Sequence, residues 1–187
     1  MVERTNSRLL DFYFGVGTDD RGRYLKEMLQ WPDSRLEEVH DYIQWMFPLA
    51  ERSGFNIHAP LLTVSEIGQF RSNPELRQNL KASFVRILGF YGLILSGSRP
   101  LEVKRALHFE EASLNWITPG NHNHLRITRI LKSLLTLGLE EEAHAFYGCL
   151  EDIYSAECAK TCPGISEATF SFWQRAANVK PHEGSRG

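Results

Sequence analysis

Apolar residues recur at helical spacing along most of this chain, and the longest such stripe follows Asn73. Asn73-Pro74-Glu75 combines a capping side chain, a proline at the first helical position and an acid in the first turn, which is a typical start of a helix. Because large apolar residues follow on one face, we expect a buried central helix over Asn73–Leu95, closed by Gly97 and Pro100. The stripe consists of Leu76, Leu80, Phe84, Ile87, Leu88, Tyr91 and Leu95.

Start and stop signals predict further helices on both sides of this one. The segment Glu51–Leu62 contains Gly54 and Pro60 and is expected to be an irregular connection, whereas Leu101–Glu111 is expected to be helical or rich in turns. We find no convincing strand pattern. The other predicted helices cover Arg21–Gln30, Asp33–Phe47, Thr63–Phe70, Asn121–Leu137, Glu140–Ala159 and a last helix capped by Ser166.

These signals together predict an all-α fold, a single-domain bundle of about six to eight helices. We expect an N-terminal segment over residues 1–20, the helical domain over 21–178 and a flexible tail over 179–187. At 187 residues the chain can bury a core without disulfides or a structural metal.

The charge balance excludes whole classes of partner. Lys and Arg total 21 against 23 Asp and Glu, a formal net charge of −2, so no global field attracts nucleic acid or an anionic membrane. No apolar run is long enough for a signal peptide or a membrane span. The three cysteines all lie late in the chain and do not form a disulfide framework, which favours a reducing cytoplasm.

The segment Asn121–Leu139 carries the strongest candidate for a binding site. Its first four residues, Asn-His-Asn-His, lie at the expected start of a helix, where free backbone N–H groups and the helix dipole favour an anion. Arg126, Arg129 and Lys132 follow on one face with no acid between them. Alternatively, Asn121 or Asn123 caps the helix and the arginines pair with acids of neighbouring helices. The candidate acids are Glu37, Glu38, Asp41 and Glu66.

The segment His40–Leu49, HDYIQWMFPL, is the second candidate. Helical spacing places His40, Ile43 and Phe47 on one face, with Trp45 elsewhere on the turn and Gln44 and Asp41 as further polar contacts. This helix would either face a ligand with an aromatic ledge or belong to the core, as aromatic residues at helical spacing usually do.

Catalytic and metal chemistry find less support. His122 and His124 could join His40 around a metal or in an active site, but a lone His-x-His pattern is weak, and neither an HExxH motif nor a CxxC pair occurs. Gly-x-Ser-x-Gly is absent. We therefore assign no catalytic residue, no metal ligand and no cofactor.

The two segments, with APLLTVSEIGQF (Ala59–Phe70) and LGFYGLIL (Leu88–Leu95), resemble the conserved N-terminal domain of the opioid growth factor receptor family. The resemblance covers roughly residues 24–150. It implies non-enzymatic binding of a peptide or small anionic ligand, because animal members bind the pentapeptide Met-enkephalin, restrain proliferation and are not seven-helix receptors. It further implies that animal members associate with the nucleus.

We accordingly predict a soluble binding domain of receptor type. Two alternatives stay open: an enzyme of unassigned chemistry that uses His40, His122 and His124, or a protein-interaction scaffold without a small ligand. The ligand-binding residues that we predict are His40, Trp45, Asn121, His122, Asn123, Arg126 and Arg129.

Overall fold

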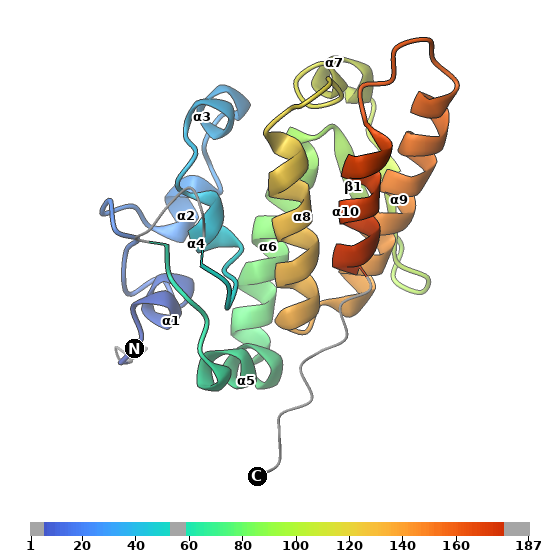
Figure 1. Ribbon diagram of the computed structural model, residues 1–187. Helices are drawn as coiled ribbons and strands as arrows, with labels where there is room; N and C mark the ends of the chain where they lie inside the picture. The colour runs from blue at the N-terminus through green and yellow to red at the C-terminus, as the bar shows by residue number, and fades with distance from the viewer. Residues whose placement is uncertain (1–5, 53–58, 178–187) are drawn as a thin grey trace.

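Four long helices form the bundle of the computed structural model, which describes residues 6–52 and 59–177 (Figure 1). They are α6 (Pro74–Phe90), α8 (Asn123–Thr136), α9 (Glu140–Cys158) and α10 (Glu167–Ala177). α8, α9 and α10 pack against one another, and α6 contacts α9 through Phe84 and Phe146, whose ring centroids are 5.5 Å apart. The predicted flexible tail over 179–187 lies outside the described residues.

The central helix begins as predicted but ends earlier. The Asn73 side chain accepts hydrogen bonds from the N–H groups of Glu75 and Leu76, and Pro74 occupies the first turn. The helix stops at Phe90 because Gly92 adopts φ 72°, a left-handed conformation that turns the chain out of the helix.

The expectation of an entirely helical fold is wrong at this point. After Gly92, β1 (Leu93–Ser96) pairs antiparallel with β2 (Glu102–Arg105), in the register Leu93 to Arg105. The sequence misled because Leu88, Tyr91 and Leu95 continue the helical spacing into a strand that is too short to show alternation. α7 (Phe109–Ser113) follows the hairpin, so the fold is mostly helical with a small two-stranded sheet.

Short helices line the other flank of α6 and α8 (Figure 1). The predicted helix Arg21–Gln30 shrinks to α2, because the Asp19 carboxylate accepts from the backbone N–H groups of Arg21 and Arg23 and holds that segment as a loop. The predicted helix Asp33–Phe47 is two helices. The elements of this flank are α1 (Arg8–Tyr13), α2 (Leu25–Met28), α3 (Asp33–Glu38), α4 (Ile43–Met46) and α5 (Val64–Ser72). Within the described residues there are ten helices rather than six to eight.

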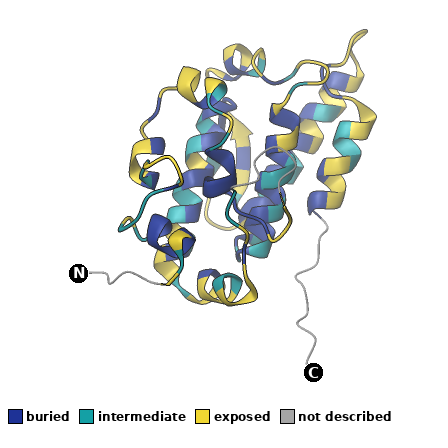
Figure 2. Cartoon of the chain, turned by 60° about the vertical axis from the view of Figure 1, so that its left-hand side comes forward, coloured by how far each residue is buried: buried dark blue, intermediate teal, exposed yellow. Residues whose placement is uncertain are grey.

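One continuous apolar core runs from Leu9 in α1 to Ala176 in α10. Leu80 and Phe84 at the centre of the α6 stripe are completely buried, as the sequence predicted. The outer faces of the helices are mostly exposed (Figure 2). In the described part of the chain no helix has both the length and the apolar character needed to cross a membrane.

Candidate functional site

One face of α8 donates hydrogen bonds to main-chain carbonyls of the segment 36–48. The donors are Arg126, Arg129 and Ser133, whose spacing of three and four places them on the same side of the helix. Helix ends leave carbonyls without intrahelical N–H partners, and these side chains supply the missing donors at the ends of α3 and α4. The acceptors are the carbonyls of Leu36, Val39, Phe47 and Pro48, at 3.0, 3.0, 3.1 and 3.0 Å.

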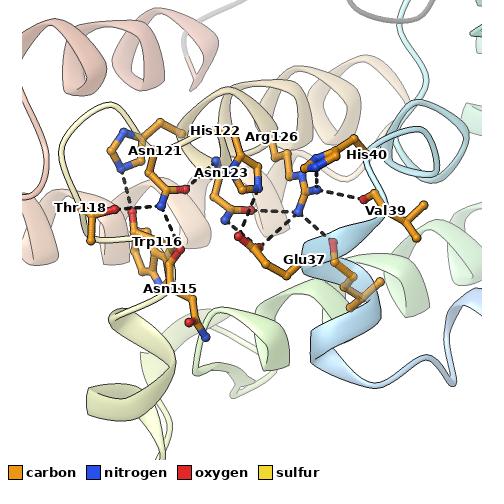
Figure 3. Close-up of polar contacts among 12 residues, drawn as sticks. Glu37, Val39, His40, Asn115, Trp116, Thr118, Asn121, His122, Asn123 and Arg126 are labelled. Atoms are coloured by element: carbon orange, nitrogen blue, oxygen red, sulfur yellow. Dashed lines mark hydrogen bonds and ion pairs between the residues drawn. The ribbon is translucent and has the colours of Figure 1, made fainter.

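Arg126 explains why the predicted helix Asp33–Phe47 is interrupted. Its guanidinium donates to the carbonyls of Leu36 and Val39 and to Nδ1 of His40, which lies in the extended link between α3 and α4 (Figure 3). The Leu36 carbonyl also accepts from the Tyr42 hydroxyl, so both of its lone pairs are used and none is left for a helical N–H four residues on. His40 therefore does not share a helical face with Ile43 and Phe47, which corrects the face predicted from spacing.

The start of α8 is closed by its own asparagines. The Asn121 Oδ1 accepts from the N–H of Asn123, and the N–H groups of His124 and Leu125 donate to the carbonyls of Asn121 and His122. Asn123 is fully buried, and its amide contacts Glu37 and Arg126 (Figure 3). The N–H groups of Asn123, His124 and Leu125 thus have partners within the chain, and the Asn121 side chain supplies one of them.

A cavity of about 340 Å³ lies beside α8, and four of the predicted residues line it. They are His40, His122, Arg126 and Arg129. The fold thus brings His40 to the start of α8, although more than eighty positions separate it from the other three. Its apolar walls are Ile43, Leu49 and Leu125.

The cavity is cationic although the chain is not. Among residues 6–52 and 59–177, four of the lining residues are Arg or Lys, namely Arg52, Arg126, Arg129 and Lys132, and none is Asp or Glu. Lys132 pairs at 3.1 Å with Glu51, whose side chain is 71% exposed, and Arg126 is 3.8 Å from Glu37. In the described ranges no carboxylate comes within ion-pair distance of Arg129.

Arg129 is a partly buried cation of this cavity with unused hydrogen-bonding capacity. One N–H of its guanidinium donates to Phe47, which leaves four of the five donors of the side chain. Burial lowers the pKa of Arg129, although an arginine this basic stays charged at neutral pH. A partly desolvated guanidinium with free donors suits a carboxylate or phosphate oxygen.

Gln44, which lines the same cavity, carries a buried polar atom without a partner. The residue is 6% exposed and lines the cavity beside Ile43. Its buried Oε1 has no hydrogen-bond partner among the residues that the structure describes. Such an acceptor costs roughly 1–3 kcal/mol unless something donates to it.

The three histidines of the predicted region are not one group. The rings of His40 and His122 lie edge to face with centroids 5.1 Å apart, and His122 Nε2 is 3.3 Å from Glu37. Burial, and next the charge of Arg126, lower the pKa of His122. His124 points elsewhere, into the core, with Nε2 at 2.9 Å from the Trp116 carbonyl. Within the described residues no cluster of three or more His, Cys, Asp or Glu is arranged to hold a metal ion.

Trp45 lies in a different cavity. This second hollow, of about 500 Å³, shares no lining residue with the first and is bounded by α1 and α5. Trp45 is 2% exposed, its ring packs against Phe12, and Arg8 lies 5.7 Å above it. The structure thus does not bring Trp45 together with His40, although the two are five residues apart.

Sequence reasoning left several lining residues out of the predicted site. Lys132 carried a signal, because it continues the row of Arg126 and Arg129 at a spacing of three. Gln44 was recognised only as a polar contact, and Leu49 ends the segment His40–Leu49 but was given no role. Arg52 belonged to no motif, because it follows the end of α4 and reaches the cavity only through the fold.

Comparisons with known proteins agree on one family. The opioid growth factor receptor (OGFr) conserved region matches residues 3–181. The human opioid growth factor receptor is 37% identical over 166 residues, 85% of this chain and 23% of the human protein. The mouse receptor is 46% identical over 122 residues, 64% of this chain and 19% of the mouse protein. The rat opioid growth factor receptor-like protein 1 is 34% identical over 155 residues, 81% of this chain and 32% of the rat protein. The chain therefore spans a third or less of these relatives, and no solved structure matches it.

Proposed function

The chain belongs to the opioid growth factor receptor family, and we propose that it is a non-enzymatic binding protein that holds a peptide or small anionic ligand in the cavity beside α8. The observation that carries this proposal is the charge of the cavity. In the described part of the chain, four Arg or Lys residues and no acid line it, although the net charge of the whole chain is −2. Such a local excess of cations favours an anionic ligand.

The unpaired donors of Arg129 give the anion a place to bind. A carboxylate or phosphate there would accept charge-assisted hydrogen bonds, and Lys132 would lie one turn along the helix. The apolar walls would bury a side chain attached to the anionic group, as is usual for small-ligand sites. The names of the relatives, which describe receptors for an opioid growth factor, support a ligand-binding role.

Three features support this reading over the alternatives. The catalytic grouping of His40, His122 and His124 is divided, because His124 is buried against Trp116 and Trp173. Among the lining residues that the structure describes, the one hydroxyl is that of Thr128, which donates to the His124 carbonyl of its own helix and so does not resemble an activated nucleophile. A pure scaffold would not require unpaired cations inside a cavity.

Lys132→Gln tests the proposal, with inorganic phosphate and N-acetyl-leucine as probes in calorimetric titrations at constant ionic strength. The variant removes one cation from the cavity and leaves only the exposed Glu51 without its partner. We expect affinity for both probes to fall about three- to tenfold, the range of one partly screened charge contact. Melting without a probe should stay unchanged.

Lys104→Gln is the matched control. Lys104 also pairs with an exposed glutamate, Glu102, at 2.7 Å, but lies on β2 away from the cavity. Its affinity for both probes should equal that of the wild type. Equal losses in the two variants, or a wild-type protein that neither probe binds or stabilises against heat, would contradict the proposed site.

A further inference from the structure

Two of the cations that line the cavity beside α8 have no carboxylate within ion-pair distance in the described parts of the chain. They are Arg52 and Arg129. The other two each have an acid nearby. Lys132 pairs at 3.1 Å with Glu51. Arg126 lies 3.8 Å from Glu37. Four cations against two acids leave the cavity with an excess of two positive charges.

The histidines of the cavity do not add to this excess near neutral pH. Burial, and next the charge of Arg126, lower the pKa of His122. Arg126 donates to Nδ1 of His40, and a ring nitrogen accepts only when it carries no proton (Figure 3). The charge of the cavity is therefore set by its arginines, its lysine and the two nearby acids.

The cationic groups donate hydrogen bonds and accept none, because neither a guanidinium nor an ammonium has an acceptor atom. Arg52 is exposed, and Arg129 uses one of its five donors on the Phe47 carbonyl. A phosphate monoester carries about −1.5 to −2 charges at pH 7 and has three acceptor oxygens, whereas a carboxylate carries a single charge. The phosphate monoester thus matches both the excess charge and the donors, and the arginine fork suits its oxygens.

The apolar wall indicates an ester rather than inorganic phosphate. Ile43, Leu49 and Leu125 line the cavity, and Leu125 is 57% exposed, so it offers apolar surface for a ligand to cover. The cavity volume of about 340 Å³ is at the lower end of the range of small-molecule sites. It therefore has room for a phosphate group and one small apolar group.

We infer that the cavity binds the dianion of a phosphate monoester whose ester group is small and apolar. The phosphate oxygens accept from Arg52 and Arg129, and the ester group covers Leu49 and Leu125. This inference rests on the proposed anion site and adds the requirement for a second negative charge. A free phosphate ester and a phosphorylated side chain of a peptide share this chemistry.

Phenyl phosphate and phenyl sulfate test the second charge, by calorimetry on the whole chain at constant ionic strength and roughly pH 7.5, where the phosphate ester is mostly doubly ionised. The two ligands have nearly the same shape, but the sulfate ester carries a single negative charge. We expect phenyl phosphate to bind about tenfold more tightly to the wild type, the lower range of one hydrogen bond to a charged group.

Arg52→Gln should reduce this preference to about threefold or less, because it removes one of the two unpaired charges. Melting without ligand should stay unchanged, since Arg52 is exposed and has no carboxylate partner in the described ranges.

Arg99→Gln is the matched control. Arg99 is also exposed and, among residues 6–52 and 59–177, also lacks a carboxylate partner, but it lies in the turn between β1 and β2 and does not line this cavity. It should keep the preference of the wild type for phenyl phosphate. Equal preferences in the two variants would overturn the assignment of the second charge to Arg52.

The outcomes separate this inference from the proposal on which it rests. Equal binding of phenyl phosphate and phenyl sulfate to the wild type would overturn the requirement for a dianion and leave the anion site intact. Methyl phosphate binding as tightly as phenyl phosphate would overturn the role of the apolar wall. Absence of binding by all three esters and by inorganic phosphate would overturn the anion site itself.

A further arm identifies the source of the ligand. A capped Ala-phosphotyrosine-Ala peptide that binds more tightly than phenyl phosphate would support a phosphorylated side chain, and the reverse order would support a free ester. The same peptide without its phosphate binding equally well would overturn the assignment, because it keeps the ring but lacks the dianion.

Discussion

His124 shows how one buried side chain can couple the stability of this protein to pH. The residue is 6% exposed, its Nε2 contacts the Trp116 carbonyl, and its ring lies edge to face with Trp173. A carbonyl accepts only a protonated ring nitrogen, so the neutral imidazole with its proton on Nε2 fits this environment. Burial accordingly lowers the pKa of His124 below its ordinary value of 6.5.

The pH dependence follows from this shift. The folded chain binds a proton at His124 less readily than the unfolded chain, so the shift has no effect on stability well above pH 6.5 and lowers the free energy of unfolding as pH falls below it. We expect His124→Asn to flatten the loss of stability between pH 7 and 5 in urea unfolding curves. His144→Asn, at an exposed position, should keep the wild-type pH profile, and the same flattening there would contradict the role of His124.

Single residues also show which features of the structure could be predicted from the sequence and which could not. The Thr63–Glu66 capping box and the left-handed Gly138 depend on neighbours along the chain, and they start α5 and follow the end of α8 close to the bounds predicted for the helices Thr63–Phe70 and Asn121–Leu137. The partners of Arg126 were predictable only in part. Glu37, one of the candidate acids, lies 3.8 Å from it, but the main-chain carbonyls of the distant segment 36–39, which also accept from Arg126, carried no signal in the sequence.

At the scale of elements, the α6–β1 junction depends on the absence of a side chain at Gly92. A Cβ there would lie 2.8 Å from both the Ala112 Cβ and the Phe109 Cα, and φ is 72°. Glycine is thus required both by the left-handed backbone and by the close approach of α7.

Gly92→Ala should therefore destabilise the protein by about 2–5 kcal/mol, the sum of left-handed strain and overpacking. Gly89→Ala is the matched control three residues earlier, inside α6, where a Cβ would meet open space. It should be neutral or stabilise by up to about 1 kcal/mol, because alanine is the better helix former. Chemical denaturation measures both, and similar values for the two variants would show that the junction does not need its glycine.

The sequence predicted least well those elements whose bounds depend on contacts with segments far away in the chain. The caps at Asn73 and Ser166 act within a few residues and set the starts of α6 and α10. The break between α3 and α4 and the β1–β2 hairpin depend instead on contacts with α8 and α7, which a local hydrophobic pattern does not contain.

At the scale of the whole molecule, the buried face of α6 is the centre of stability. Phe84 is completely buried and packs edge to face on Phe146 of α9. We expect Phe84→Ala to cost about 3–5 kcal/mol through lost burial and a residual cavity. Val85→Ala, at a position 47% exposed on the same helix, should change the free energy of unfolding by no more than about 0.5 kcal/mol. Equal costs for both in guanidinium denaturation would contradict this assignment.

Net charge, the coarsest property of the molecule, concealed the candidate site. A total of −2 averages over the surface, whereas the fold gathers Arg52, Arg126, Arg129 and Lys132 around one cavity. Three of these four lie on α8 and were visible as a row in the sequence. The periodicity of the sequence did not show that this row would face apolar residues of α4, because that arrangement depends on tertiary packing.

The hydrogen bonds between α8 and the segment 36–48 connect residues 82 to 90 positions apart. At a synthesis rate of about 5–20 residues per second, the early segment leaves the ribosome on the order of ten seconds before its donors exist. During that interval α3 and α4, of six and four residues, are too short to persist as isolated helices. The cavity therefore cannot be preassembled by the N-terminal third of the chain: it appears only when α8 docks, so the capacity to bind and the completed fold arrive together.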